Sequence, residues 1–192
     1  MNLPNKLTLS RVLLAPIAII FILYPIGGEL CARIIAAAVF IITSLTDMLD
    51  GKIARKYNLI TNFGKFMDPL ADKFMVIGML VAMCASEMYA RFRLLLVWAT
   101  LLVIFRELAV TSLRLLVASS EKKIVIAANW LGKVKTVTQI VCIITLIIEP
   151  VILPFDTLGI LSWVTIAAMT VMTVWSGTNY LLSYKSFINP NE

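Results

Sequence analysis

Long apolar runs alternate with short polar breaks along the whole chain. The runs cover Val12–Ile26, Ile34–Thr46, Phe74–Ala85, Leu94–Ala118, a fifth segment that Trp130–Lys135 opens and that ends near Ile148, and Leu158–Leu182. Runs of this kind, separated by charged or helix-breaking residues, are typical of helices that lie in a bilayer. The pattern therefore predicts an all-α integral membrane protein with six transmembrane helices.

The polar breaks predict the connections between these helices. They are Gly27–Glu29, Tyr57–Asn62, Glu87–Arg93, Ser119–Lys123 and Glu149–Asp156. The last break holds Pro150 and Pro154 and is predicted to be a turn, because proline interrupts a helix. Residues 1–11 are polar with intermittent leucine and predict a short interfacial segment. Pro69 is compatible with the first turn of the third helix. No internal repeat or separate soluble part is visible, so residues 1–192 are expected to form a single membrane domain.

Composition agrees with a membrane protein. Of the 192 residues 60% are hydrophobic and only 15% are charged, which leaves too little polar surface to cover a soluble globule. The formal net charge of +6 reflects an excess of Lys and Arg. In a membrane protein such an excess sets the orientation in the bilayer and attracts anionic lipid headgroups. Nucleic acid is not expected as a partner, since no soluble basic domain or aromatic platform is present.

The basic residues are distributed unevenly between the two ends of the predicted helices. Six spans put both termini on one side, and the other side receives only three of the 17 basic residues, Arg33, Arg91 and Arg93. The remaining fourteen lie on the side of the termini: Lys6, Arg11, Lys52, Arg55, Lys56, Lys65, Lys73, Arg106, Arg114, Lys122, Lys123, Lys133, Lys135 and Lys185. Lys and Arg accumulate on the cytoplasmic side, so the termini are predicted to be cytoplasmic. With no cleavage site or transit peptide apparent, we expect an uncleaved first helix and a bacterial inner membrane.

Four aspartates interrupt the second and third runs. Asp47 and Asp50 are three residues apart, and Asp68 and Asp72 are four apart, so each pair lies on one face of its helix. Gly64 continues the second face at the same four-residue spacing. Asp47 lies ~20 Å beyond Arg33 along its helix, which places the acidic residues near the cytoplasmic edge of a hydrocarbon core ~30 Å thick.

Two interpretations of the aspartates are open. In one, they pair with the nearby cations Lys52, Arg55, Lys65 and Lys73. In the other, which we favour, they bind a divalent cation through hard oxygen ligands, since intramembrane acids are usually functional. Thiolate or imidazole ligation is excluded, because the chain has no histidine and its three cysteines are scattered. Those cysteines, Cys31, Cys84 and Cys142, are expected to be buried, reduced packing residues.

A second charged group lies in the fourth and fifth runs. Arg106 is ~18 Å into its helix from Leu94, at about the depth of the aspartates. It either pairs with Glu107 or an aspartate, or recognises a phosphate together with Arg114. Lys133 and Lys135 are two residues apart and point in separate directions on a helix. One of them is therefore expected to face the pocket and the other the lipid headgroups.

The acidic pattern resembles the signature of the CDP-alcohol phosphotransferases (CDP-alcohol phosphatidyltransferases). That signature is D-x-x-D-G-x-x-A-R, eight residues, and then G-x-x-x-D-x-x-x-D. Here it reads Asp47, Asp50, Gly51, Ala54, Arg55, Gly64, Asp68 and Asp72, without departure. Eight fixed positions at fixed spacing are a specific match.

The resemblance implies a role for each of these residues. Asp47, Asp50, Asp68 and Asp72 would hold one or two Mg²⁺ or Mn²⁺ ions, and Asp72 would also be the general base. Gly51, Ala54 and Gly64 would make room for the cytidine nucleotide of CDP-diacylglycerol, and Arg55 would touch its phosphates. The alternative for the three small residues is that they are helix-packing contacts.

Other segments resemble the phosphatidylglycerophosphate synthase branch of that family. They are the opening NLPNKLTLSRVLLAPI, the segment RELAVTSLR at 106–114 and the segment GKVKT at 132–136. The branch implies glycerol 3-phosphate as acceptor, Arg106, Arg114, Lys133 and Lys135 around its phosphate, release of CMP, and a homodimer. Inositol phosphate, serine or phosphatidylglycerol remain alternative acceptors. A cation-coupled transporter is the alternative from a different class.

Overall fold

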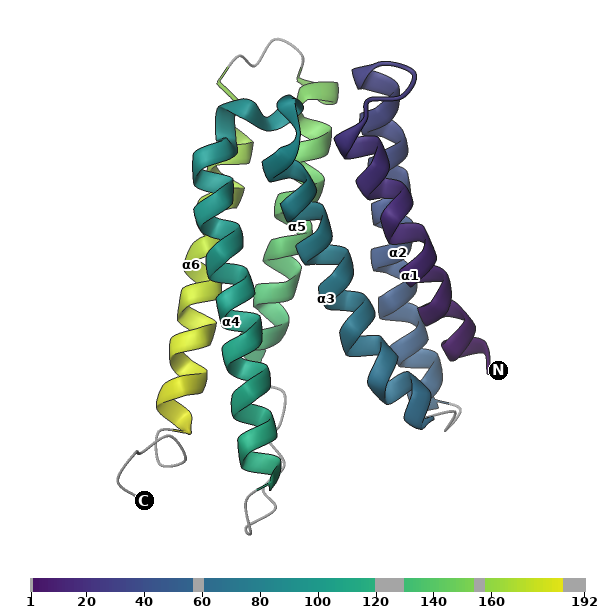
Figure 1. The fold of residues 1–192 in the computed structure, drawn as a ribbon, viewed down its shortest axis with the longest axis vertical. Helices are drawn as coiled ribbons and strands as arrows, with labels where there is room; N and C mark the ends of the chain where they lie inside the picture. The colour runs from purple at the N-terminus through teal and green to yellow at the C-terminus, as the bar shows by residue number, and fades with distance from the viewer. Residues whose placement is uncertain (1, 57–60, 120–129, 154–157, 185–192) are drawn as a thin grey trace.

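The structure, a computed structural model, describes the chain except residues 1, 57–60, 120–129, 154–157 and 185–192, and except the side chains of residues 3, 4, 48–56, 65, 118 and 119. The described residues form α1 (Leu3–Leu23), α2 (Glu29–Lys56), α3 (Asn62–Ala85), the 3-10 helix η1 (Glu87–Phe92), α4 (Arg93–Ser119), α5 (Trp130–Ile152) and α6 (Ile160–Ser183). Figure 1 shows the six long helices running along one common direction. The predicted all-helical fold is confirmed for the described residues.

Five helices among the described residues are long and apolar enough to cross a membrane. Their spans are Asn5–Leu23, Glu29–Asp47, Glu87–Val117, Trp130–Ile152 and Ile160–Ser183. The predicted third span, α3, is not among them, and it carries Asp68, Asp72 and Lys73 in its first half. Figure 1 nevertheless shows α3 running beside the other helices from one end of the bundle to the other.

The first helix differs from the prediction at both ends. It begins at Leu3, so most of the residues predicted as a separate interfacial segment, 1–11, are continuous with the first helix. Proline stands in its opening turn, where a missing amide donor costs little. It ends at Leu23, and Gly27 and Gly28 then make the connection with φ angles of 79° and 94°. These left-handed conformations suit glycine, which has no Cβ to clash.

Two predicted polar breaks also fold differently. The break Glu87–Arg93 forms η1, in which Tyr89 and Phe92 are buried. The turn predicted for Glu149–Asp156 is wrong in its first part, because α5 continues through Pro150 to Ile152. Glu149 is buried, and its carboxylate accepts hydrogen bonds of 2.8 Å from the amides of Leu161 and Ser162. It thereby satisfies free amide donors at the start of α6.

Three smaller expectations are corrected as well. Pro69 lies inside α3, not in its first turn, which starts at Asn62 with Thr61 as its cap. Cys31 is exposed and Cys84 is half-buried, so only Cys142 is a fully buried packing residue as expected.

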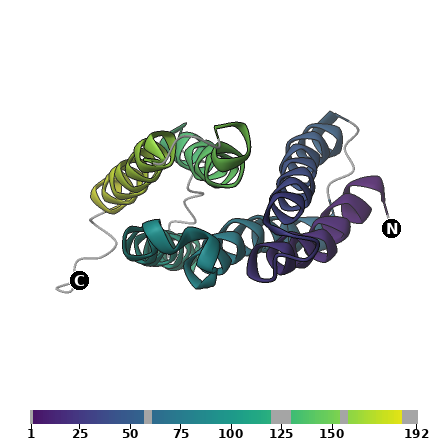
Figure 2. The same cartoon turned by 90° about the horizontal axis from the view of Figure 1, so that it is seen from above.

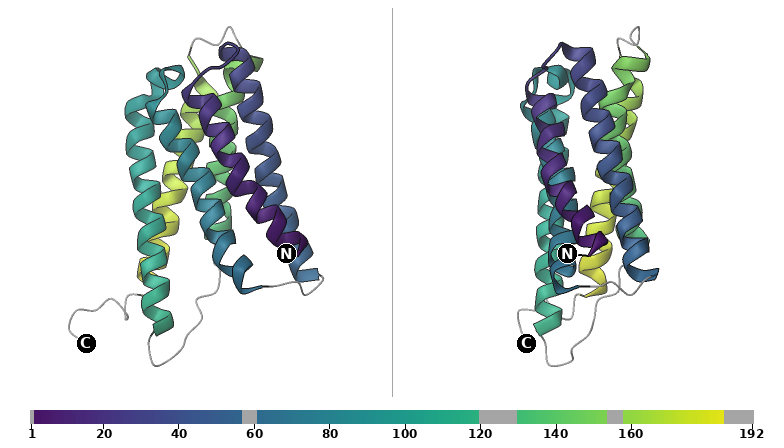
Figure 3. Two further views of the ribbon diagram at one scale, coloured as in Figure 1. Left: turned by 45° about the vertical axis from the view of Figure 1, so that its right-hand side comes forward. Right: turned by 90° about the vertical axis from the view of Figure 1, so that its right-hand side faces the viewer.

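The helices pack as two groups of three. α1, α2 and α3 contact one another on one side, while α6 packs against both α4 and α5 on the other. Contacts between α3 and α4 and between α2 and α5 join the groups. Figure 2, seen along the bundle, and the side views of Figure 3 show the arrangement of the two groups. They lie close together on the side of α3 and α4 and are further apart away from it.

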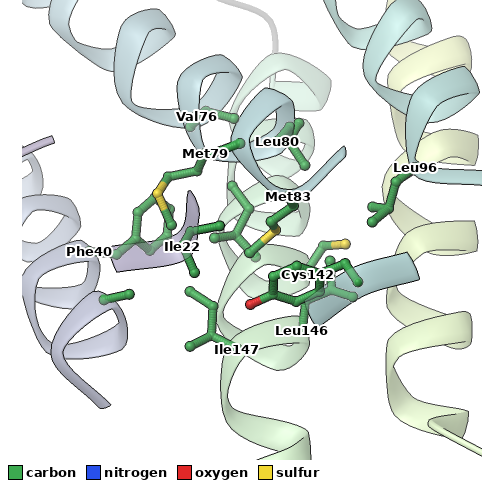
Figure 4. Packing of buried hydrophobic residues seen from close by; sticks show 14 of the residues in the cluster. Ile22, Phe40, Val76, Met79, Leu80, Met83, Leu96, Cys142, Leu146 and Ile147 are labelled. Carbon is green, nitrogen blue, oxygen red and sulfur yellow. The ribbon is translucent and has the colours of Figure 1, made fainter. Parts of the chain in front are cut away.

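The apolar core fills one end of the bundle. All six long helices and η1 contribute to it, and its members include Ile22, Phe40, Met79, Leu96, Leu146 and Ile166. Figure 4 shows several of these side chains meeting between the helices. Polar side chains are buried at both ends: Arg33 and Glu149 lie at this end, and Asn5, Arg11, Arg106 and Lys135 lie toward the other.

Candidate active site

Three of the four aspartates converge on a single arginine. Arg11 of α1 is buried, with 1% of its side chain exposed, and its Nη1 bonds to Oδ1 of Asp47 on α2. The same nitrogen donates to Oδ1 of Asp72 on α3 at 2.5 Å, and Nη2 lies 3.8 Å from Oδ1 of Asp68. The carboxylates remain about a third to a half exposed. Three helices thus bring three like charges around one cation.

Polar side chains of α1 hold the start of α3 in place. Thr8 Oγ1 donates to Asp68 Oδ1 at 2.6 Å, and Thr61 Oγ1 donates to Asn5 Oδ1 at 2.9 Å. Thr61 also accepts a hydrogen bond of 3.0 Å from the amide of Gly64, which caps α3. The acidic face of α3 is therefore oriented by α1.

Arg11 was not predicted as a site residue. From the sequence it was counted only among the basic residues that set the orientation in the membrane. A signal was present: Asn5, Thr8 and Arg11 recur every three residues in the first half of an otherwise apolar helix. That spacing puts them on one face. All three are buried, and they face the site.

Of the four neighbouring cations that could pair with the aspartates, Lys73 is the one whose side chain is described. Lys73 donates to Thr111 on α4. The side chains of Lys52, Arg55 and Lys65 lie outside the described residues. Asp47 and Asp72 pair with a residue from a different helix.

The chemistry of the described aspartates suits a divalent cation. Three carboxylates already gather about one positive charge, and carboxylate oxygen is the ligand that Mg²⁺ and Mn²⁺ prefer. Within the described side chains no group of three acidic, histidine or cysteine residues forms a complete ligand set. The fourth predicted ligand, Asp50, lies on α2 one turn beyond Asp47, but its side chain is outside the described residues.

The predicted nucleotide contacts are described only in part. Gly51, Ala54 and Arg55 belong to the last turns of α2, and their side chains lie outside the described residues. Gly64 is buried, and a Cβ there would come within 3.2 Å of Asn5 Oδ1 and 3.3 Å of Thr61 Oγ1. At this position glycine leaves room for the side chains of Asn5 and Thr61, which a Cβ would displace by a few tenths of an ångström.

A cavity of about 690 Å³ extends from the aspartates near Arg11, the acidic cluster, to the charged residues of α4 and α5. Asp47 and Asp72 line one part of it, and Arg106, Glu107 and Arg114 of α4 line another. Apolar side chains of α2 and α5 form much of the remaining wall, namely Ile41, Leu45, Val137, Ile140, Val141 and Ile144. A cavity with this mixed lining suits a molecule that has both a charged head and hydrocarbon.

The basic residues of α4 and α5 that line the cavity form a cationic wall. Hydrogen bonds and an ion pair to Glu107 hold this wall together. Arg106 is buried, and its Nη1 donates to Glu107 Oε1 at 3.0 Å. Lys135 from α5 is also buried and pairs with the same carboxylate oxygen. Arg106 pairs with Glu107, as one interpretation expected, and it also lines the cavity; recognition of a phosphate stays a prediction.

Lys133 and Lys135 both line this cavity, although only one of them was expected to do so. Lys133 is exposed while Lys135 is buried. Arg114 reaches the same cavity from one helical face of α4, two turns beyond Arg106. The structure thus brings together Asp47, Asp72 and all four predicted acceptor-site cations around one space.

Fold and site together define a helical membrane protein that presents an acidic cluster and a cationic wall to one partly apolar cavity. The chain belongs to the CDP-alcohol phosphatidyltransferase family, whose profile matches residues 1–175.

Relatives with assigned functions agree with this membership. The chain is 43% identical to the CDP-diacylglycerol–glycerol-3-phosphate 3-phosphatidyltransferase of Bacillus subtilis, over 91% of this chain and 92% of that protein. It is 36% identical to the protein of the same name from Salmonella choleraesuis, over 94% of this chain and 93% of that protein. The chain is therefore an enzyme of a phosphatidyltransferase family, and the transporter alternative is set aside.

Proposed function

We propose that this protein transfers the phosphatidyl group of CDP-diacylglycerol to the 1-hydroxyl of glycerol 3-phosphate and releases CMP. The observation that carries the proposal is the single cavity that has Asp47 and Asp72 on one wall and Arg106, Arg114 and Lys135 on another. An acceptor that carries its own phosphate needs such a group of cations, whereas a neutral alcohol does not.

The reaction forms one bond and breaks one bond at the same phosphorus. The acceptor oxygen bonds to the phosphorus that carries the diacylglycerol, and the bond from that phosphorus to the bridging oxygen of CMP breaks. The acceptor proton passes to the carboxylate of Asp72, which lines the cavity and has a partly exposed side chain. Reaction then depends mainly on positioning the two substrates and on neutralising charge.

Asp47, Asp68 and Asp72, with Asp50 of the same helix as Asp47, are the residues that would hold one or two Mg²⁺ or Mn²⁺ ions. Such ions, when bound, polarise the phosphorus and stabilise the leaving CMP. Arg11 gathers the three described carboxylates around its guanidinium, which supports their proposed role as neighbouring ligands. Gly51, Ala54, Arg55 and Gly64 are proposed to contact the cytidine nucleotide and its phosphates.

The proposed topology has six spans, with α3 as the third and with both termini and the site on the cytoplasmic side of a bacterial inner membrane. It is supported by the distribution of basic residues and by the length of α3, which matches that of the bundle (Figure 1). A position at the bilayer edge suits a donor with two acyl chains and a water-soluble head. The whole chain is proposed to be one domain, and the homodimer stays a prediction.

An acceptor panel tests the proposal. Purified protein in lipid nanodiscs would receive CDP-diacylglycerol together with glycerol 3-phosphate, inositol phosphate, serine or phosphatidylglycerol, and CMP release would be followed by ³¹P NMR. We expect release that depends on glycerol 3-phosphate and on Mg²⁺ or Mn²⁺. Turnover with another acceptor but not with glycerol 3-phosphate would overturn the assignment of the acceptor.

A further inference from the structure

Two polar residues of α6 reach the cationic wall of the cavity. Ser176 and Tyr180 lie one helical turn apart and are both buried, with 0% and 2% of the residue exposed. Neither stood out in the sequence, in which α6 is an apolar run with scattered hydroxyl groups. Their partners are the arginines of α4 that line the cavity.

Tyr180 contacts two guanidinium groups. Arg114 Nη2 donates a hydrogen bond of 2.9 Å to the Tyr180 hydroxyl. The Cζ atoms of Arg106 and Arg114 each lie 5.5 Å from the centroid of the Tyr180 ring. The face of an aromatic ring is electron-rich and attracts a guanidinium within about 6 Å. One side chain thus makes a favourable contact with both cations.

Ser176 holds one terminal nitrogen of Arg106, Nη2, in place. Its hydroxyl accepts a hydrogen bond of 2.7 Å from Arg106 Nη2, while Arg106 Nη1 bonds to Glu107. Both terminal nitrogens of this arginine are therefore engaged by different helices. A guanidinium held at two points keeps one orientation, and its remaining donors point in fixed directions.

A glycine allows α6 to come this close to Arg106. A Cβ at Gly177, beside Ser176 on α6, would lie 3.1 Å from Arg106 Cγ, which is tighter than an ordinary contact. The stem of Arg106 packs directly on the backbone of α6, which leaves the arginine little freedom to turn away.

We propose that Tyr180 and Ser176 are positioning residues that hold the guanidinium groups of Arg106 and Arg114 at a fixed separation on the cavity wall, so that both can bind the phosphate of the acceptor. The inference rests on the proposed function and deepens it. Two guanidinium groups repel each other, and without the ring that contacts both of them they would move apart. Binding a phosphate would then have to reorder two long side chains, which weakens affinity.

This role predicts a selective effect on the acceptor. Both substrates carry phosphate, but the phosphates of the donor are proposed to lie at the metal ion of the aspartates and at Arg55. The two arginines on the opposite wall are therefore proposed to serve the phosphate of the acceptor. Loss of Tyr180 should therefore raise the KM for the acceptor and leave the KM for CDP-diacylglycerol nearly unchanged. A purely structural role would instead reduce the amount of active enzyme and leave both KM values as they are.

The chain offers a matched control in Tyr89. It is also buried, its ring lies 5.0 Å from Arg33 Cζ, and its hydroxyl accepts a hydrogen bond of 3.4 Å from Arg33 Nη1. It lies in η1, at the end of the bundle opposite the site. Tyr89→Phe therefore removes the same kind of tyrosine–arginine contact away from the cavity.

The experiment compares Tyr180→Phe, Tyr180→Leu, Ser176→Ala and Tyr89→Phe with the unsubstituted full chain in nanodiscs. We expect the acceptor KM to rise roughly fivefold in Tyr180→Phe, which keeps the ring, and roughly thirtyfold in Tyr180→Leu, which loses ring and hydroxyl. Ser176→Ala should raise it roughly fivefold. Tyr89→Phe should lower the unfolding temperature without changing the acceptor KM. If Tyr180→Leu does not fold, Tyr180→Phe and Ser176→Ala decide.

A second measurement does not depend on turnover. Inorganic phosphate should raise the unfolding temperature of the unsubstituted protein and of Tyr89→Phe, and should do so much less in Tyr180→Leu. Unchanged acceptor KM and unchanged stabilisation by phosphate in the Tyr180 variants would overturn the inference while the proposed function stands. Weaker phosphate stabilisation in those variants, combined with no transfer to glycerol 3-phosphate by the unsubstituted protein, would overturn the function and keep the positioning role.

Discussion

Arg11 and Asp72 are 61 positions apart in the chain, and Arg11 Nη1 donates a hydrogen bond of 2.5 Å to Asp72 Oδ1. The contact joins the first helix to the residue proposed as the general base. Asp47 bonds to the same nitrogen, so one guanidinium orients acidic side chains of two other helices. This relationship makes Arg11 as much a part of the site as the aspartates themselves.

Arg11→Gln should destabilise the protein, because Asp47, Asp68 and Asp72 would then face one another without the arginine. We expect the unfolding temperature in EDTA to fall by roughly 5 °C, which corresponds to about 1–2 kcal/mol. Added Mg²⁺ should recover part of this loss, since a divalent cation would supply positive charge to the same oxygens. Thermal unfolding followed by tryptophan fluorescence measures both values. An equal loss with and without Mg²⁺ would contradict the shared use of these carboxylates.

Asp72→Asn should remove turnover and keep donor binding. The amide is close in shape to the carboxylate but cannot accept the proton of the acceptor, so kcat should fall by roughly 10²–10⁴-fold. Binding of CDP-diacylglycerol, measured by microscale thermophoresis, should change far less. Glu29→Gln, which alters a carboxylate paired with Arg33 at the opposite end, is the matched control. Robust activity of Asp72→Asn would reject the role of Asp72 as base.

Arg106→Ala should raise the KM for glycerol 3-phosphate by roughly 10–100-fold, as expected for the loss of a charged hydrogen-bonding group. The exposed residue Lys133 lines the same cavity and provides a comparison, because Lys133→Ala removes a solvated charge and should have a smaller effect. Steady-state kinetics at saturating donor separate the two variants. If Arg106→Ala lowered only stability and its residual enzyme kept the normal KM, phosphate binding by Arg106 would be wrong.

Gly64→Ala should destabilise the contact between α1 and α3. The added Cβ would lie 3.2 Å from Asn5 Oδ1 and 3.3 Å from Thr61 Oγ1, so these two side chains, which hydrogen-bond to each other, would have to move apart from it. We expect a loss of about 1–2 kcal/mol in the free energy of unfolding. Gly132→Ala serves as control, since its Cβ would meet nothing nearer than 3.8 Å. Equal unfolding temperatures for the two variants would show that α1 adapts freely.

The pattern of residues along the chain was sufficient to predict the helices and to identify the acidic motif. The apolar runs predicted the helices, because a backbone in lipid must satisfy its hydrogen bonds internally. The fixed spacing of Asp47, Asp50, Asp68 and Asp72 put each pair on one helical face, and the resemblance it carries led to the family. The ends of the helices were less predictable: Glu149 looked like part of a polar turn, and it is in fact a buried residue that binds the start of α6.

By itself, then, the sequence determined an all-helical membrane protein, an acidic site near one end of the helices and the chemistry of a phosphatidyltransferase. Only the tertiary structure decided which residues complete that site. Arg11 meets residues 36 and 61 positions away, and Arg106 meets Ser176 at a separation of 70. Local spacing reports which side chains share a helical face, but the partner of that face depends on how six helices pack, and that packing follows from the shape of the whole apolar core.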